Sequence, residues 1–158
     1  MYKIKTLFIL LLCTSCATTY IPPQGPDTAV LIMPVASSKL FPELSDRKVA
    51  FAVSGEDGCG KVVKQVPPEN RDDEVTKVKI PSNTKIFVKF LGNTGNSICS
   101  AAGSFIPETG KVYKVEKLRS YNYCSVGVVL IEDGKKTPIE LERAYPDSMS
   151  GTTICDHR

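Results

Sequence analysis

From residue 28 to residue 145 the chain consists of short stretches of alternating apolar and polar residues, separated by turn-forming segments. Residues 85–91 show the pattern most clearly, because Ile86, Val88 and Phe90 fall on one face and Phe87 falls on the other. A period of two residues is typical of a half-buried β-strand, and no segment shows a long helical period. The sequence therefore predicts an all-β fold, an antiparallel β-sandwich of about seven or eight strands.

The strands are expected at residues 28–35, 48–54, 60–66, 74–80, 85–91, 98–106, 111–118 and 124–131. The last of these is almost continuously apolar, which favours a central strand covered on both faces. Residues 137–145 leave two alternatives open. Ile139 and Leu141 alternate with polar residues as in a strand, but Thr137-Pro138-Ile139-Glu140 also fits a helix start with a threonine cap. We favour the strand, because residues 132–135 readily form a hairpin turn.

The N-terminal residues have the layout of a secretory signal. Two lysines precede an apolar run at residues 7–12, and two small residues, Thr14 and Ser15, stand before Cys16. The run is too short to cross a bilayer as a helix, which needs ~20 apolar residues. We therefore expect residues 1–15 to be a signal peptide that is removed from the mature protein.

The end of this segment, Leu12-Cys13-Thr14-Ser15-Cys16, resembles the lipobox of bacterial lipoproteins. In that family the cysteine after the cleavage site becomes the lipidated first residue, and a leucine usually stands three places before it. Here Cys13 occupies that place, and Leu12 stands one place further back. The resemblance implies that Cys16 carries the lipid, and Ala17 resembles the pattern that directs lipoproteins of Gram-negative cells to the outer membrane. The alternative is a plain signal peptide with an unmodified Cys16.

Residues 16–27 contain three prolines and a glycine, so we expect the lipidated Cys16 to be followed by a flexible tether. Residues 28–158 are then expected to form one β-sandwich domain. Removal of Lys3 and Lys5 with the signal leaves eighteen basic and seventeen acidic residues, so the net charge falls from +3 to +1. A nearly neutral domain argues against nucleic acid as a partner.

If Cys13 is removed and Cys16 is lipidated, four cysteines remain: Cys59, Cys99, Cys124 and Cys155. An even number in an exported domain predicts two disulfides, and free thiols are the alternative. We favour Cys59–Cys99, because both residues lie at predicted strand ends. We favour Cys124–Cys155, because a last strand running back along residues 124–131 would finish near Cys124.

The sequence lacks a recognisable catalytic set. Its one histidine, His157, lies next to the C-terminus, where a triad could not hold it unless Cys155 anchored the tail. Cys155-Asp156-His157 has no second ligand pair at a spacing suited to a metal. The acidic residues mostly fall in predicted turns, and phosphate-binding, calcium-binding and nucleophile-elbow motifs are missing. We therefore expect no enzyme activity, no cofactor and no metal.

A tyrosine-rich bend is the candidate binding loop. Arg119, Tyr121, Asn122 and Tyr123 could form a contact patch, because tyrosine buries area while keeping a polar group; packing at the sandwich rim is the alternative. The leading hypothesis is a non-catalytic binding or accessory domain that is anchored to the membrane by its N-terminal lipid and faces the periplasm. Its partners would be the membrane itself and an envelope protein. A second hypothesis is an inhibitor of an envelope-attacking hydrolase, acting through residues 119–123 or 92–96. A third is an enzyme that uses loop carboxylates.

Overall fold

The computed structural model describes residues 20–34, 47–63, 75–93, 98–120, 123–147 and 152–157. Its strands are β1 (Thr28–Pro34), β2 (Arg47–Val53), β3 (Cys59–Lys61), β4 (Val75–Pro81), β5 (Ile86–Asn93), β6 (Ile98–Phe105), β7 (Val112–Ser120), β8 (Tyr123–Glu132), β9 (Lys135–Ile139), β10 (Glu142–Arg143), β11 (Tyr145–Pro146) and β12 (Thr153–Cys155). The described ranges hold no helix, and hence none long and apolar enough to cross a membrane. The predicted all-β fold is confirmed.

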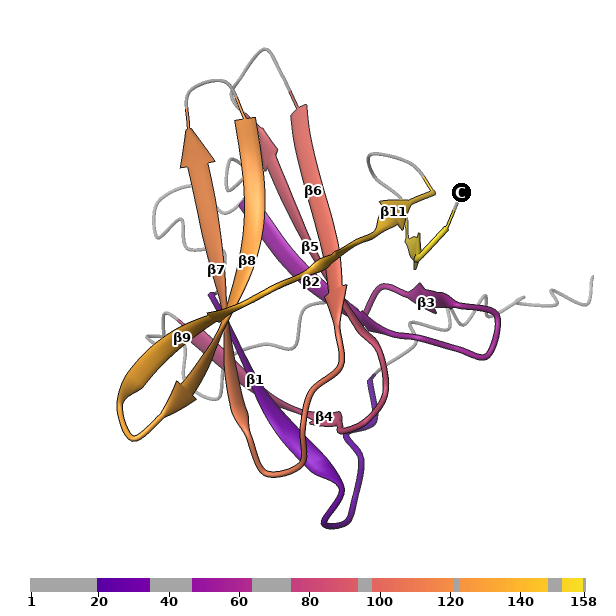
Figure 1. Ribbon diagram of the computed structural model, residues 1–158. Helices are drawn as coiled ribbons and strands as arrows, with labels where there is room; N and C mark the ends of the chain where they lie inside the picture. The colour runs from indigo at the N-terminus through magenta and orange to yellow at the C-terminus, as the bar shows by residue number, and fades with distance from the viewer. Residues whose placement is uncertain are drawn as a thin grey trace, which may run out of the picture.

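The strands form two main sheets and one small sheet (Figure 1). The five-stranded sheet has the order β4-β1-β7-β8-β9, and the four-stranded sheet has the order β10-β6-β5-β2. The three-stranded sheet, β11-β12-β3, is built from short segments. Eight of the described strands have five or more residues, in agreement with the predicted number.

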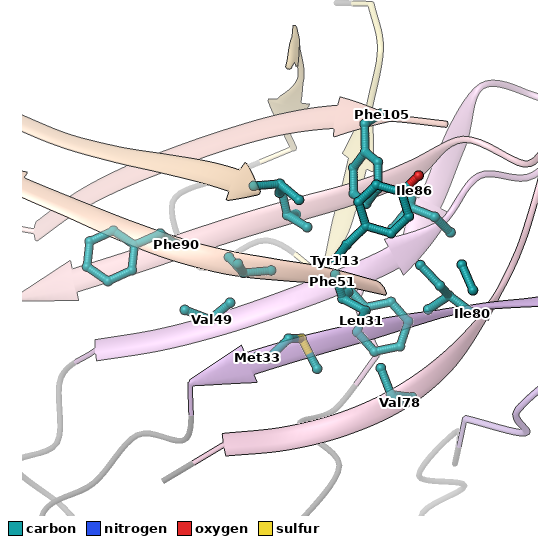
Figure 2. Close-up of a cluster of buried hydrophobic side chains, with 14 residues drawn as sticks. Leu31, Met33, Val49, Phe51, Val78, Ile80, Ile86, Phe90, Phe105 and Tyr113 are labelled. Atoms are coloured by element: carbon teal, nitrogen blue, oxygen red, sulfur yellow. The ribbon is translucent and has the colours of Figure 1, made fainter. Parts of the chain in front are cut away.

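The core lies between the two main sheets, because alternate residues of their strands point inward. Leu31 and Val128 come from the five-stranded sheet, and Phe51, Val88 and Phe90 come from the four-stranded sheet. All five side chains are buried in one apolar cluster (Figure 2). Burial of apolar area from both sheets is what holds a sandwich together, so the predicted architecture is confirmed.

One pair of neighbouring strands departs from the antiparallel pattern. β1 and β7 run parallel, with Val30 opposite Val112 and Ile32 opposite Lys114. Parallel neighbours need a crossover connection rather than a tight turn. Here the connection from β1 to β7 contains β2, β5 and β6 of the four-stranded sheet, β4 of the five-stranded sheet and β3 of the third sheet. The two main sheets are therefore interleaved along the chain.

The predicted strand at residues 137–145 is confirmed in its first part only. β9 pairs with β8 from Ile139 opposite Val128 to Lys135 opposite Glu132. The chain then leaves this sheet, and β10 pairs with β6 in the other one, as the long diagonal ribbon in Figure 1 shows. β8 is an interior strand between β7 and β9, as predicted, but the expected cover on both of its faces is wrong. β8 lies next to the edge strand β9, and most of its described side chains are partly exposed.

The described C-terminal residues belong to the small third sheet, where the Cys59–Cys155 bond holds them. Ile154 of β12 is fully buried against Phe87, Ala52 and Ala144 on the outer face of the four-stranded sheet. Gly60 of β3 permits this close approach. A Cβ atom at Gly60 would lie 2.6 Å from the Val53 carbonyl oxygen and 2.9 Å from the Ala52 Cβ. The third sheet thus gives the outer face of the four-stranded sheet a core of its own.

Candidate functional site

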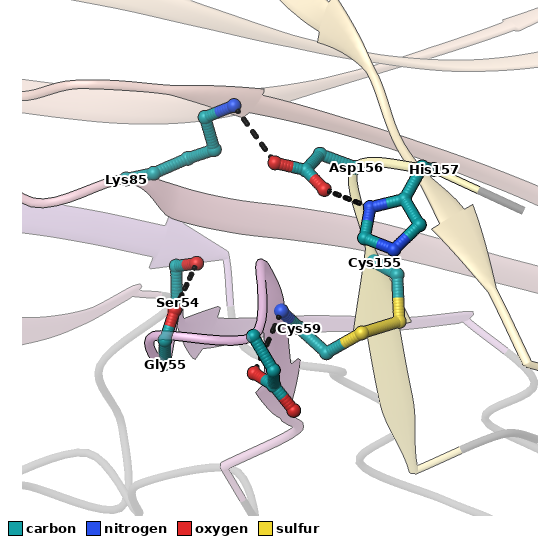
Figure 3. The surroundings of a disulfide bond; sticks show 8 residues. Ser54, Gly55, Cys59, Lys85, Cys155, Asp156 and His157 are labelled. Atoms are coloured by element: carbon teal, nitrogen blue, oxygen red, sulfur yellow. Dashed lines mark hydrogen bonds and ion pairs between the residues drawn. A yellow bond between two sulfur atoms is a disulfide. The ribbon is translucent and has the colours of Figure 1, made fainter.

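The four cysteines form two disulfides, as expected, but the favoured pairing is wrong. The bonds are Cys59–Cys155 and Cys99–Cys124, with Cα–Cα distances of 4.1 and 6.1 Å. The error lies in the path of the chain after Ile139, which crosses to the other sheet instead of running back to Cys124. β12 therefore reaches β3, where Cys155 lies directly opposite Cys59. Figure 3 shows this bond and the turn before Cys59, where the Cys59 amide donates to Asp57 Oδ1 at 3.1 Å.

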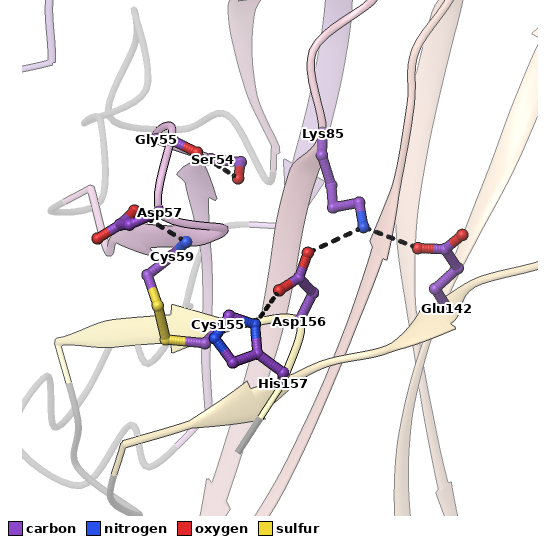
Figure 4. Close-up of polar contacts among 9 residues, drawn as sticks. All are labelled: Ser54, Gly55, Asp57, Cys59, Lys85, Glu142, Cys155, Asp156 and His157. Atoms are coloured by element: carbon purple, nitrogen blue, oxygen red, sulfur yellow. Dashed lines mark hydrogen bonds and ion pairs between the residues drawn. A yellow bond between two sulfur atoms is a disulfide. The ribbon is translucent and has the colours of Figure 1, made fainter.

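A polar cluster lies beside the Cys59–Cys155 bond (Figure 4). The Lys85 Nζ atom is 3.0 Å from Glu142 Oε2 and 3.2 Å from Asp156 Oδ2. The other Asp156 oxygen, Oδ1, is 2.7 Å from Nδ1 of His157. Lys85 precedes β5, Glu142 belongs to β10 and Asp156 follows β12. The cluster therefore joins three segments that are distant in the sequence.

The contacts in this cluster stabilise the ionised forms of Lys85 and Asp156. Hydrogen bonds with Glu142 and then Asp156 raise the pKa of Lys85. Hydrogen bonds with His157 and then Lys85 lower the pKa of Asp156. All these groups are solvated, with 71% of the Glu142 side chain exposed, so each pair stabilises the fold only modestly.

The Asp156–His157 pair resembles part of an acid–base set, but its surroundings do not complete one. Among the described residues His157 has no hydroxyl or thiol within hydrogen-bond reach, and the Cys155 sulfur is bonded to Cys59. Nor do the described residues hold a group of three or more His, Cys, Asp or Glu side chains arranged for a metal ion. What the cluster can do is fix the C-terminal segment, so we describe it as a latch.

The candidate binding loop is described in part. Arg119 ends up opposite Cys124 at the tip of the β7–β8 hairpin, and Tyr123 opposite Ser120. Tyr121 and Asn122 lie outside the described residues, as do residues 94–96 of the other candidate loop, 92–96. The Cys99–Cys124 bond joins the start of β6 to the start of β8, so the strands that leave both candidate loops are linked at one end of the sandwich.

Tyr20, a residue of the predicted tether, is packed on the domain. Its ring meets the Phe51 ring edge-on, with centroids 5.1 Å apart, and its hydroxyl donates to the Lys79 carbonyl oxygen at 2.8 Å. Phe51 lies on β2, an edge strand of the four-stranded sheet, and Lys79 lies on β4, an edge strand of the five-stranded sheet. Tyr20 therefore connects the two main sheets at these edges. Burial raises the pKa of Tyr20 to about 12. The neighbouring Ile21 is 83% exposed.

The outer face of the five-stranded sheet combines apolar and basic side chains. The strand register places Lys79, Val30, Val112, Ile131 and Lys136 in one row across the five strands. The next row is Lys77, Ile32, Lys114, Val129 and Pro138. These two rows are called the lysine-flanked face below.

The lysine-flanked face carries an excess of positive charge. Lys136 is 3.1 Å from Glu116, which lies opposite Gly127 in the row beyond Lys114. Lys77, Lys79 and Lys114 have no ion-pair partner within the described ranges. Most of the apolar residues between them are only partly buried, so the face is a candidate interaction surface.

Sequence reasoning missed Tyr20, the latch and the lysine-flanked face. The alternation of Val30 with Ile32 and of Lys77 with Lys79 was visible, but only the register between non-consecutive strands brings these residues together. Comparison of the chain with protein-family models, with curated proteins and with solved structures finds no match.

Proposed function

We propose that this protein is a lipoprotein of the bacterial cell envelope, held in the outer membrane by acyl chains on Cys16 and facing the periplasm. Its folded part acts as a non-catalytic binding or accessory domain. The observation that carries the proposal is the position of Cys16, which directly follows the signal-like segment and stands four residues before Tyr20. Two disulfides in a small domain support an oxidising compartment.

The binding role is supported by the surface of the domain. The lysine-flanked face presents partly exposed Val30, Ile32, Val112 and Ile131 beside charged groups, whereas the latch offers no complete catalytic arrangement. Exposed apolar residues rimmed by polar groups are typical of surfaces that contact a protein or a membrane. A rigid, disulfide-linked sandwich holds such a face in a fixed shape with little ordering cost on binding.

Mass spectrometry of the native protein tests the anchor. We expect the mature chain to begin at Cys16 and to be heavier than its sequence by the mass of the acyl chains. The Cys16→Ser variant should move from the membrane fraction to the soluble fraction, while the matched Cys13→Ser variant stays at the membrane. An intact N-terminus at Met1 would overturn the proposal.

A second candidate function, inhibition of an envelope-attacking hydrolase, is favoured by one observation. The Cys99–Cys124 bond brings the strands of both candidate loops to one end of the molecule, where a protruding loop could enter an active site. Peptidoglycan hydrolases assayed with the purified protein test this idea. Inhibition should weaken in the Arg119→Ala variant and persist in the Lys135→Ala variant, whose substitution lies on β9. Equal inhibition by both variants would remove the β7–β8 loop from consideration.

A further inference from the structure

We infer that the lysine-flanked face lies against the anionic lipid surface of the membrane that holds the anchor. This inference rests on the lipidation of Cys16 proposed above and adds an orientation to it. It commits to a lipid surface rich in anionic headgroups as the occupant of the face, rather than to a protein.

The length of chain between the lipid and the domain is the first argument. Four residue steps separate Cys16 from Tyr20, and a fully extended chain spans at most ~3.5 Å per step, or ~14 Å in all. The Tyr20 hydroxyl is bonded to the Lys79 carbonyl, and Lys79 is a corner of the lysine-flanked face. The chain therefore keeps the Tyr20 backbone within ~14 Å of the lipidated residue, and Tyr20 in turn holds the Lys79 corner on the anchored side of the domain.

The composition of the face is the second argument. Lys77, Lys79 and Lys114 bring three positive charges that no described carboxylate neutralises. Lysine stems can lie along apolar surface while their ammonium groups reach phosphate oxygens, and each lysine near an anionic leaflet strengthens the attraction. Ile21, next to Tyr20 and 83% exposed, adds an apolar side chain at the anchored corner.

The other broad surface of the molecule is less suited to this role. The outer face of the four-stranded sheet is covered in part by the third sheet, with Phe87, Ala144 and Ile154 buried between them. The latch on that side carries the carboxylates of Glu142 and Asp156, which an anionic surface would repel. Charge and burial thus both select the lysine-flanked face.

Tryptophan fluorescence can test the orientation, because the natural chain contains no tryptophan. The full lipidated protein is reconstituted in vesicles of phosphatidylethanolamine and phosphatidylglycerol that contain a headgroup spin label as quencher. Ile21→Trp reports on the anchored corner, Ile32→Trp on the lysine-flanked face, and Thr152→Trp on the third-sheet side. Val112→Trp is a second reporter on the face if Ile32→Trp does not fold.

We expect strong quenching at Ile21→Trp and Ile32→Trp and little at Thr152→Trp. Replacing Lys77, Lys79 and Lys114 with glutamine should reduce the quenching of the Ile32→Trp reporter to the level seen with Thr152→Trp. The loss expected is about fivefold in surface affinity per lysine. Glutamine at Lys61 and Lys135, which lie outside the two rows, is the control and should leave the quenching unchanged; it is compared with the Lys77→Gln/Lys79→Gln variant, which removes the same number of charges from the face.

The outcomes separate this inference from the proposed function. Protein that stays on the vesicles with Ile21→Trp quenched but Ile32→Trp unquenched would overturn the orientation and leave the anchor intact. Protein that is not retained by the vesicles at all would overturn the anchor itself. A face reporter that is already shielded in detergent, without vesicles, would indicate a protein occupant and would also overturn the inference.

Discussion

Tyr20 is a single side chain that joins the two main sheets, because it contacts Phe51 through its ring and Lys79 through its hydroxyl. The Tyr20→Phe substitution keeps the ring contact and removes the hydrogen bond. We expect the free energy of unfolding to fall by about 1 kcal/mol, the usual net value of such a bond. Urea denaturation of the two proteins measures the difference, and equal midpoints would contradict the role assigned to the hydroxyl.

The pKa of Tyr20 makes the same bridge sensitive to alkali. Burial raises it from an ordinary value near 10 to about 12, so the folded state favours the neutral phenol. The resulting stability is present below pH 10 and is lost as the pH rises through about 12. We expect the stability of the natural protein to fall more steeply over this range than that of the Tyr20→Phe variant. If the free energy of unfolding falls equally with pH in both proteins, the Tyr20 hydroxyl is not buried as described.

Gly60 has no room for a side chain, because a Cβ atom there would overlap the Val53 carbonyl oxygen and the Ala52 Cβ atom. The Gly60→Ala substitution should displace β3 and cost about 1–3 kcal/mol, as overpacking usually does. Gly127 is a matched control on β8, since the nearest atom to a Cβ there would be 3.8 Å away. Thermal unfolding should separate the two variants, and similar midpoints would count against close packing at β3.

At the scale of elements, the period-two alternation was sufficient to predict most strands. β5 alternates from Ile86 to Phe90, and the inward positions are those that the core buries. Each strand is specified locally, by the pattern of its own side chains and the turn residues around it. The fold class and the number of strands with five or more residues were therefore predictable, whereas most of the two- and three-residue strands were not.

The partners of each strand were less predictable, because pairing depends on contacts between distant segments. The residues around Ile139 do not show whether β9 continues along the whole of β8 or leaves it at Ile139. The point at which β9 leaves decides which cysteine lies opposite Cys155. The lysine-flanked face was missed for the same reason, since it requires β1 to lie beside β7. Ile154 was missed because one apolar residue in a polar segment has no period.

Ile154 shows how much a three-residue strand contributes. The side chain is fully buried against Phe87 and Ala144. We expect Ile154→Ala to cost about 2–5 kcal/mol, the range for cavity-forming substitutions, and to expose Phe87 to solvent. Thr152→Ala, at an exposed neighbouring position, should cost less than about 0.5 kcal/mol. Denaturation and hydrogen exchange at β12 measure the difference. Equal stability and equal exchange in the two variants would show that β12 does not contribute to the stability of the fold.

At the scale of the whole molecule, the two disulfides constrain the unfolded chain unequally. Cys59–Cys155 spans 96 residues and Cys99–Cys124 spans 25. The chain-entropy relation assigns them about 4.7 and about 3.5 kcal/mol. We expect the Cys59→Ala/Cys155→Ala variant to unfold at lower denaturant than the Cys99→Ala/Cys124→Ala variant. Peptide mapping of the natural protein should recover the same two linkages, and any other linkage would contradict this topology.

The nested arrangement of these bonds also limits when the chain can be oxidised. Cys59 and Cys99 are the first two body cysteines in the sequence, yet they are not native partners, because Cys59 pairs with the last cysteine. A polypeptide that enters an oxidising compartment from its N-terminus would present these two thiols to each other first. Maturation then requires either delayed oxidation until Cys155 has arrived or thiol–disulfide exchange that rearranges an early, non-native link.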